Sequence, residues 1–309
     1  MRNDKIESAL LRQSQAIGVF LDIQGAFDNM DHDAIVAAMT DRGFDREFIN
    51  WYEQYLRNRT IIVELAGEQA VRTLTRGVPQ GGILSPIIWN IVFDSCLAEL
   101  SNIAFTTGFA DDGCIIVTGS NPDSCRDIAQ RSLDAAVDWG LRHGLTFSTE
   151  KTVCVQFKRS DFKQPTKLVM GDLSIDFQDS CKYLGVTLNS RLEWSEHLHR
   201  VAEKAKKILH LARSYVSKHS GVRPRLMHCQ HWMWQSLVQP VLLYGCHLWA
   251  HSIGTKQVNI LQKVCRQAML NIATHHDGTP TKGLQVILNI IPPHVAAKYQ
   301  ALCTYERIS

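Results

Sequence analysis

The chain has 309 residues, of which 45% are hydrophobic and 20% charged, with a net charge of +3. This composition is typical of a globular protein of about two domains and excludes a low-complexity chain. The apolar runs are shorter than the roughly 18 residues of a membrane span, and the N-terminus lacks the apolar segment of a secretory signal. We therefore expect an intracellular protein of the nucleus or cytoplasm that is neither secreted nor bound to a membrane.

The first elements in chain order are a short amphipathic helix within residues 1–16 and an apolar strand, Ile17–Leu21, that ends at Asp22. Helical spacing of apolar residues then predicts helices over Asp31–Arg42 and Asp45–Arg57. Asp28 is expected to cap the first of these helices. The runs 60–65 and 70–74 are separated by a turn and predict a β-hairpin.

A glycine-rich segment, Arg76–Pro86, follows the hairpin and precedes an apolar helical run, Ile87–Leu100. Glycines beside a proline and a glutamine allow the backbone to approach a ligand closely. Ser85 is expected to cap the helix, with Pro86 in its first turn.

Two adjacent aspartates, Asp111 and Asp112, lie between strand-forming runs and therefore predict the tip of a second hairpin. Such a pair alone is more often a solvated turn. Asp22 supplies a third carboxylate at the end of a neighbouring strand, and three hard oxygen ligands suit Mg²⁺. Two ions held in this way could support an in-line phosphoryl displacement.

The second half of the chain changes from mixed structure to helix. Asn121 and Gly144 are expected to begin and end a helix over 122–143. Strands are predicted at 152–157, 168–177 and 183–188, and helices after Ser195, at 230–243 and at 256–272. The predicted class is α+β, an antiparallel sheet with packed helices followed by an all-α region.

The charge is concentrated in one stretch. Residues 200–225 contain eight basic side chains and one acid, a net charge of +7 that leaves −4 for the remainder. Such a segment suits contacts with nucleic-acid phosphates, although a solvated helix face is the other interpretation.

Nine cysteines are scattered singly, so reduced and mostly buried thiols are expected. A set of histidines and cysteines near the C-terminus matches no standard zinc spacing, and we interpret it as structural. Its members are His228, Cys229, His231, Cys246, His247 and His251.

The ordered motifs resemble those of reverse transcriptases. The matching segments are Asp22–Asp28, Arg76–Pro86, Phe109–Asp112, Gly144–Thr152 and Lys182–Leu188. The continuation Leu192–Leu198 is similar to the entry into the thumb of non-LTR (LINE-type) retrotransposon enzymes. The resemblance covers roughly residues 17–211.

This resemblance implies a polymerase palm over residues 17–190, a helical thumb and connection-like region over 191–309, and a remnant over 1–16. It implies an RNA-directed DNA polymerase that transfers nucleotides from dNTPs to a primer 3′-hydroxyl on an RNA template, with two Mg²⁺ ions, or Mn²⁺ as the alternative. The implied partners are the RNA template, the DNA primer or target, dNTPs and other segments of a longer polyprotein.

The resemblance also implies residue roles. Asp22, Asp111 and Asp112 would bind metal, and Lys151 would be a general acid, with a surface lysine as the alternative. The implied nucleotide or template contacts are Phe27, Gln80 and Gly81; the primer grip is Tyr183, Leu184 and Gly185; the backbone contacts are Lys204, Lys206, Lys207 and Arg213. For Phe27 the role is a steric gate against ribonucleotides, with core packing as the alternative.

Only 21 residues precede Asp22, fewer than the fingers region of intact reverse transcriptases requires. We therefore expect an N-terminally truncated enzyme. A catalytically incomplete protein that retains nucleic-acid binding is the alternative, and a metal-dependent nuclease fits the glutamine-glycine motif least well.

Overall fold

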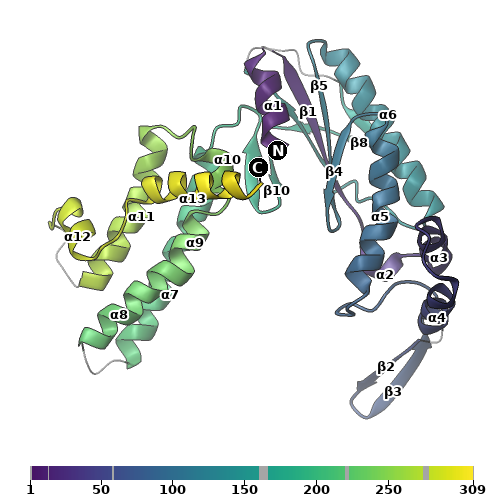
Figure 1. Ribbon diagram of the computed structural model, residues 1–309, viewed down its shortest axis with the longest axis horizontal. Helices are drawn as coiled ribbons and strands as arrows, with labels where there is room; N and C mark the ends of the chain where they lie inside the picture. Colours follow the sequence, from purple (N-terminus) through teal and green to yellow (C-terminus); the bar gives the residue numbers. More distant parts are fainter. Residues whose placement is uncertain are drawn as a thin grey trace. The chain divides into compact units, whose positions relative to one another are not determined.

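The computed structural model describes residues 2–12, 14–57, 59–159, 166–219, 223–273 and 278–308. The chain divides into two compact units, Met1–Leu184 and Gly185–Ser309, and Figure 1 labels their helices and several of their strands. Within the described ranges, no helix is long and apolar enough to cross a membrane.

The first unit is built on a five-stranded sheet with the order β4-β5-β1-β6-β9. Its strands are β1 (Gln15–Asp22), β4 (Phe105–Phe109), β5 (Asp112–Gly119), β6 (Val153–Phe157) and β9 (Phe177–Gln178). Central β1 is antiparallel to both β5 and β6, but β9 is parallel to β6. The sheet was predicted to be antiparallel but is mixed. After β6, the chain returns to the level at which β6 begins, so β9 runs in the same direction as β6 when it pairs with it.

The sheet is covered on both faces, which explains why the whole apolar run of β1 is buried. Alternate residues such as Ile17 and Val19 belong to a core shared with Trp89 of α5 (Ser85–Ser101) and Trp139 of α6 (Pro122–Arg142). Helix α1 (Arg2–Leu11) packs against β1 and β5, and Figure 1 shows it on the side of the strands away from α5 and α6. The amphipathic N-terminal segment is therefore an integral layer of this unit.

Three helices in the first unit have boundaries close to the predicted ones. Helix α6 begins after Asn121, whose side chain accepts two backbone hydrogen bonds, and Gly144 has a positive φ of 67°. Helices α3 (His32–Asp41) and α4 (Arg46–Arg57) also lie within one residue of their expected bounds.

Two capping predictions were wrong. Asp31 caps α3 by accepting hydrogen bonds from two backbone N–H groups, whereas Asp28 lies in the separate short helix α2 (Ala26–Asn29). Ser85 does not cap α5, because its hydroxyl donates to the Pro79 carbonyl at 2.6 Å and closes the preceding loop instead.

The predicted hairpin is present as β2 (Thr60–Leu65) and β3 (Glu68–Thr73). The predictions of continuous strands over 168–177 and 183–188 were wrong, because turns with positive φ at Gly171, Leu184 and Gly185 interrupt these segments. The resulting short strands are β7 (Leu168–Met170), β8 (Leu173–Ile175), β9, β10 (Ser180–Tyr183) and β11 (Val186–Asn189).

The second unit is helical after β11. Its helices are α7 (Ser195–His219), α8 (Arg223–Met233), α9 (Gln239–Leu242), α10 (Cys246–Trp249), α11 (Thr255–Ala273), α12 (Thr281–Ile287) and α13 (Pro293–Ile308). A π-helical turn, η1 (Trp234–Val238), interrupts the predicted helix over 230–243. Pro240 cannot donate to the carbonyl four residues earlier, so the preceding turn widens.

Apolar residues recur at steps of four and three from Val201 to Tyr215, which predicts a buried stripe along this segment, helix α7. Val201, Ala205 and Ala212 are buried, whereas Ile208 is half-buried. The side chain of Tyr215, the last member of the predicted stripe, lies outside the described residues.

Candidate active site

The two strands that were predicted to carry the carboxylates are neighbours in the sheet. Asp22 at the end of β1 is directly opposite Asp112 at the start of β5, and Ala110 and Asp111 form the turn that joins β4 to β5. Directly opposed residues of an antiparallel pair have their side chains on the same face. The ring nitrogen of buried Trp89 donates to the Ala110 carbonyl at 2.8 Å and thereby fixes the turn.

The three carboxylates influence one another electrostatically. Partial burial raises the pKa of Asp112, and the neighbouring charges of Asp111 and Asp22 raise it further. Asp22 Oδ2 is buried and accepts no hydrogen bond from any residue that the structure describes. The Lys151 ammonium lies 3.4 Å from this oxygen, close enough for ion pairing.

The chemistry of these carboxylate donors suits a hard divalent cation. Carboxylate oxygens are the ligands that Mg²⁺ prefers, and a cation would offset both the mutual repulsion and the unsatisfied Asp22 oxygen. In the described parts of the chain, however, no three His, Cys, Asp or Glu side chains converge closely enough to hold an ion. That finding also covers the described C-terminal histidines and cysteines.

Lys151 lies near Asp22 because the segment before it, residues 146–148, forms hydrogen bonds with the end of β1 and the residues that follow it. Gln24 N–H donates to the Thr146 carbonyl at 2.9 Å, and Ser148 N–H donates to the Asp22 carbonyl at 2.8 Å. Lys151 N–H in turn donates to the Ser148 hydroxyl at 3.3 Å. The predicted catalytic lysine is therefore positioned beside a predicted metal ligand.

The glycine-rich loop is fastened to the turn after Asp22. Gly77 N–H donates to the Met30 carbonyl and Val78 N–H to the Phe27 carbonyl, each at 2.7 Å. The Gln80 side-chain amide donates to Asp28 Oδ1 at 2.9 Å. These contacts bring the expected nucleotide-binding segments together.

Phe27 is half-buried, with its ring centroid 6.1 Å from that of Trp89. This placement accommodates core packing and leaves part of the ring accessible. Gly81 is exposed with a φ of 85°, and no described atom lies within 4 Å of the position of an added Cβ.

Sequence reasoning missed the importance of Gly77 and His32. A Cβ at Gly77 would lie 2.5 Å from the Asp28 carbonyl oxygen, so the close approach requires glycine. His32 is 4% exposed, and its Nε2 lies 3.0 Å from the Gly77 carbonyl. Gly77 belongs to a recognisable glycine-rich motif, whereas no sequence pattern identifies a contact for His32.

The expected primer-grip residues lie where the two units divide. In the first unit, the Tyr183 ring packs 5.1 Å from the Phe20 ring, between centroids. Leu184 has a φ of 46° and Gly185 a φ of 78°, as a tight turn requires. In the second unit, the Arg200 guanidinium donates to the Gly185 carbonyl.

His197 holds the start of the second unit together. It is completely buried; its Nδ1 accepts from Thr187 N–H, and its Nε2 lies 3.3 Å from the Tyr244 carbonyl. Desolvation lowers the pKa of His197. A neutral ring that donates from Nε2 satisfies both contacts.

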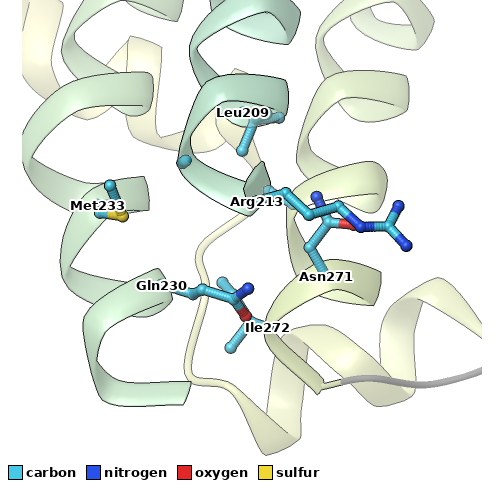
Figure 2. Close-up of a pocket in the computed structure, with 8 residues that line it drawn as sticks. Leu209, Arg213, Gln230, Met233, Asn271 and Ile272 are labelled. Atoms are coloured by element: carbon cyan, nitrogen blue, oxygen red, sulfur yellow. The ribbon is translucent and has the colours of Figure 1, made fainter. Parts of the chain in front are cut away.

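The expected backbone-binding cations lie on α7. Lys204, Lys207 and Arg213 are exposed, while Lys206 is half-buried and forms an ion pair with Glu203 at 2.6 Å. Figure 2 shows Arg213 and Asn271 beside a small pocket bounded by α7, α8 and α11. Its space of about 10 Å³ suits about one water molecule, so it is too small for a nucleotide.

Comparison with known proteins identifies the family. The family model described as reverse transcriptase (RNA-dependent DNA polymerase) matches residues 2–188. The chain belongs to the reverse transcriptase family. This confirms the family that the sequence motifs predicted.

Similar proteins relate this reverse transcriptase to those of non-LTR retrotransposons. It is 27% identical to the putative 115 kDa protein of the type-1 retrotransposable element R1DM of Drosophila melanogaster, over 93% of this chain and 28% of that protein. It is 26% identical to the RNA-directed DNA polymerase from mobile element jockey of the same species, over 82% of this chain and 28% of that protein. The chain thus spans less than a third of the length of these relatives.

A solved structure of telomerase from Candida tropicalis, in complex with a fragment of telomeric RNA, is 13% identical. The match covers 94% of this chain and 52% of the telomerase, with a TM-score of 0.45.

Proposed function

We propose that this reverse transcriptase region synthesises DNA on an RNA template by two-metal nucleotidyl transfer to a primer 3′-hydroxyl. The observation that supports this most directly is the pairing of Asp22 with Asp112, beside the turn that contains Asp111. The proposed partners are an RNA template, a DNA primer or target, dNTPs and other segments of a longer polyprotein.

In this proposal the three aspartates would hold two Mg²⁺ or Mn²⁺ ions, which would supply activation of the attacking hydroxyl and charge neutralisation at the leaving oxygen. Lys151 donates a proton to the departing pyrophosphate. Its ammonium already lies 3.4 Å from Asp22 Oδ2, so the proton is held next to the reacting centre.

The remaining residues position the substrates. Phe27 limits the space beneath the incoming sugar, and Gln80 and Gly81 face the nucleotide from the loop that is fastened to Phe27 and Asp28. The primer contacts are Tyr183, Leu184 and Gly185. Residues 17–190 form the palm in this proposal, residues 191–309 the thumb and connection-like region, and residues 1–16 the segment that precedes the palm.

A second candidate function is nucleic-acid binding without catalysis. It is favoured by the exposed cations Lys204, Lys207 and Arg213 on α7, the opposite face of which is buried. Cations arranged in this way contact phosphates without any need for a metal site.

Primer extension on poly(rA)/oligo(dT) with Mg²⁺ or Mn²⁺ tests the first proposal. Asp111→Ala should abolish incorporation, whereas Asp172→Ala should not, because Asp172 lies in the turn of a different hairpin, between β7 and β8. Loss of activity in both variants, or in neither, would contradict the assigned metal site. RNA binding by an inactive chain that weakens in a Lys204, Lys207 and Arg213 triple alanine variant would support the second function.

A further inference from the structure

Asp28 forms an unusual contact for an exposed side chain. It accepts a hydrogen bond at 2.9 Å from Nε2 of Gln80, which lies 52 positions later in the chain. Both side chains are exposed, so their bond contributes little to the free energy of folding. The main effect of this bond is therefore on the orientation of the Gln80 amide group and not on the stability of the fold.

The backbones on both sides of this contact are fixed. The carbonyls of Phe27 and Met30 accept hydrogen bonds from Val78 and Gly77, which hold the loop at the level of Asp28. Gly77 approaches Asp28 so closely that an added Cβ would lie 2.5 Å from the Asp28 carbonyl oxygen. These backbone contacts therefore hold the Asp28 and Gln80 side chains close to each other.

The chemistry of the pair determines how the amide is turned. An ionised carboxylate accepts hydrogen bonds but cannot donate them, so the –NH₂ group of Gln80 must face Asp28. The amide carbonyl, Oε1, then lies on the far side of the amide group. Without Asp28, the amide could rotate and offer a donor in place of this acceptor.

We infer that Asp28 is a positioning residue that turns the Gln80 carbonyl oxygen toward the incoming nucleotide, where it accepts a hydrogen bond from the sugar or the base. This inference rests on the proposed polymerase function, because only a polymerase places a nucleotide beside Gln80. Asp28 itself does not touch the nucleotide in this arrangement.

Two measurements that require no turnover test the inference. The first is the side-chain amide signal of Gln80 in [¹⁵N]glutamine-labelled protein, assigned by its absence in Gln80→Ala. It should shift in Asp28→Ala, which removes the acceptor, and stay unchanged in Asp41→Ala, a control at an exposed aspartate in the last turn of α3. An unchanged signal in Asp28→Ala would overturn the inference whether or not the protein is active.

The second measurement is equilibrium binding of dTTP, with Mg²⁺, to the protein on poly(rA) with a dideoxy-terminated oligo(dT) primer. Asp28→Ala, which removes the acceptor of this hydrogen bond, should weaken dTTP binding about fivefold, the effect of losing the orientation of one hydrogen bond. Gln80→Ala should weaken it as much, and the double variant no further. In Asp28→Ala, the affinity for the primer–template and the melting temperature should stay unchanged, because a purely structural role would alter these instead.

Primer extension by the wild-type chain separates this inference from the proposed function. Absent extension with intact, Asp28-dependent dTTP binding would contradict the catalytic proposal alone. Unaltered dTTP affinity in Asp28→Ala, or no measurable dTTP binding by the wild type, would overturn the positioning role.

Discussion

Asp22 and Asp112 are direct cross-strand partners, with β1 ending at the first carboxylate and β5 beginning at the second. Like charges that face each other across a strand pair are destabilising. The raised pKa of Asp112 has the same origin, since partial burial and the charges of Asp111 and Asp22 all disfavour its ionised form. The carboxylates at this end of β1 and β5 therefore repel one another, and a bound cation would relieve that repulsion.

Asp112→Asn should raise the melting temperature of the metal-free protein by about 1–2 °C at neutral pH, because one of the opposed charges is removed. The wild type should gain more than the variant when Mg²⁺ is added, since the variant has lost one ligand. Thermal denaturation with EDTA and with Mg²⁺ measures both effects. Asp172→Asn serves as the control, and a metal-free variant less stable than the wild type would contradict this account.

The sequence predicted those features that local chemistry determines. Asn121 and Gly144 set the ends of α6, and the Asp111–Asp112 pair formed the expected hairpin tip because strand-forming runs flank it. The family motifs also led to Lys151 as a neighbour of the metal ligands. Its ammonium now lies beside Asp22, although its role stays a prediction.

The features that were missed depend on contacts between distant residues. His32 and Gly77 are 45 positions apart, and their hydrogen bond has no local signature. Ser85 had the pattern of a helix cap, yet the folded loop offers its hydroxyl the Pro79 carbonyl instead. Where two partners compete for one polar group, tertiary packing selects between them, and local sequence cannot predict the result.

The close approach of Gly77 to Asp28 can be tested by adding a methyl group. Gly77→Ala should lower the free energy of unfolding by about 3 kcal/mol, combining backbone strain at a φ of 82° with overlap against a carbonyl oxygen. Gly81→Ala is the matched control, since Gly81 has a φ of 85° but no described atom within 4 Å of the added Cβ. It should cost about 1 kcal/mol. Urea denaturation measures both values, and equal losses would show that overlap is not the cause.

His197 predicts a defined dependence of stability on pH. Its pKa is lowered by burial, so the folded state retains the neutral ring while the unfolded chain takes up a proton near its ordinary value of 6.5. Stability should therefore be constant above about pH 6.5 and fall as the pH decreases below it. Burial also lowers the pKa of His247, so this histidine adds to the loss of stability at low pH.

His197→Gln isolates this contribution. The variant should be about 2 kcal/mol less stable than the wild type at pH 7.5, because two buried contacts are disturbed. Its stability should fall less between pH 7.5 and pH 5.5, with His247 responsible for part of the remaining dependence. His199→Gln, at an exposed position on the same helix, should retain the wild-type profile. A His197→Gln profile parallel to the wild type would mean that His197 is not the titrating group.

Lys151 and a divalent cation should compete for Asp22. The ammonium lies 3.4 Å from Asp22 Oδ2, and its positive charge repels any ion that approaches the same oxygen. Lys151→Gln should therefore increase the affinity for Mn²⁺ by about two- to fivefold at low salt, a modest effect because the lysine is largely exposed. Titration of the primer-free protein followed by electron paramagnetic resonance measures the affinity directly.

The matched control is Lys167→Gln, because Lys167 forms an exposed ion pair with Asp176 at 2.9 Å in the same unit. It should leave Mn²⁺ affinity unchanged. The difference between the two variants should shrink at high salt, since screening weakens the repulsion from an exposed charge. If Lys151→Gln bound Mn²⁺ no more tightly than Lys167→Gln at low salt, Lys151 would not act on Asp22 through its charge, and its placement beside the carboxylate would have to serve substrate contacts alone.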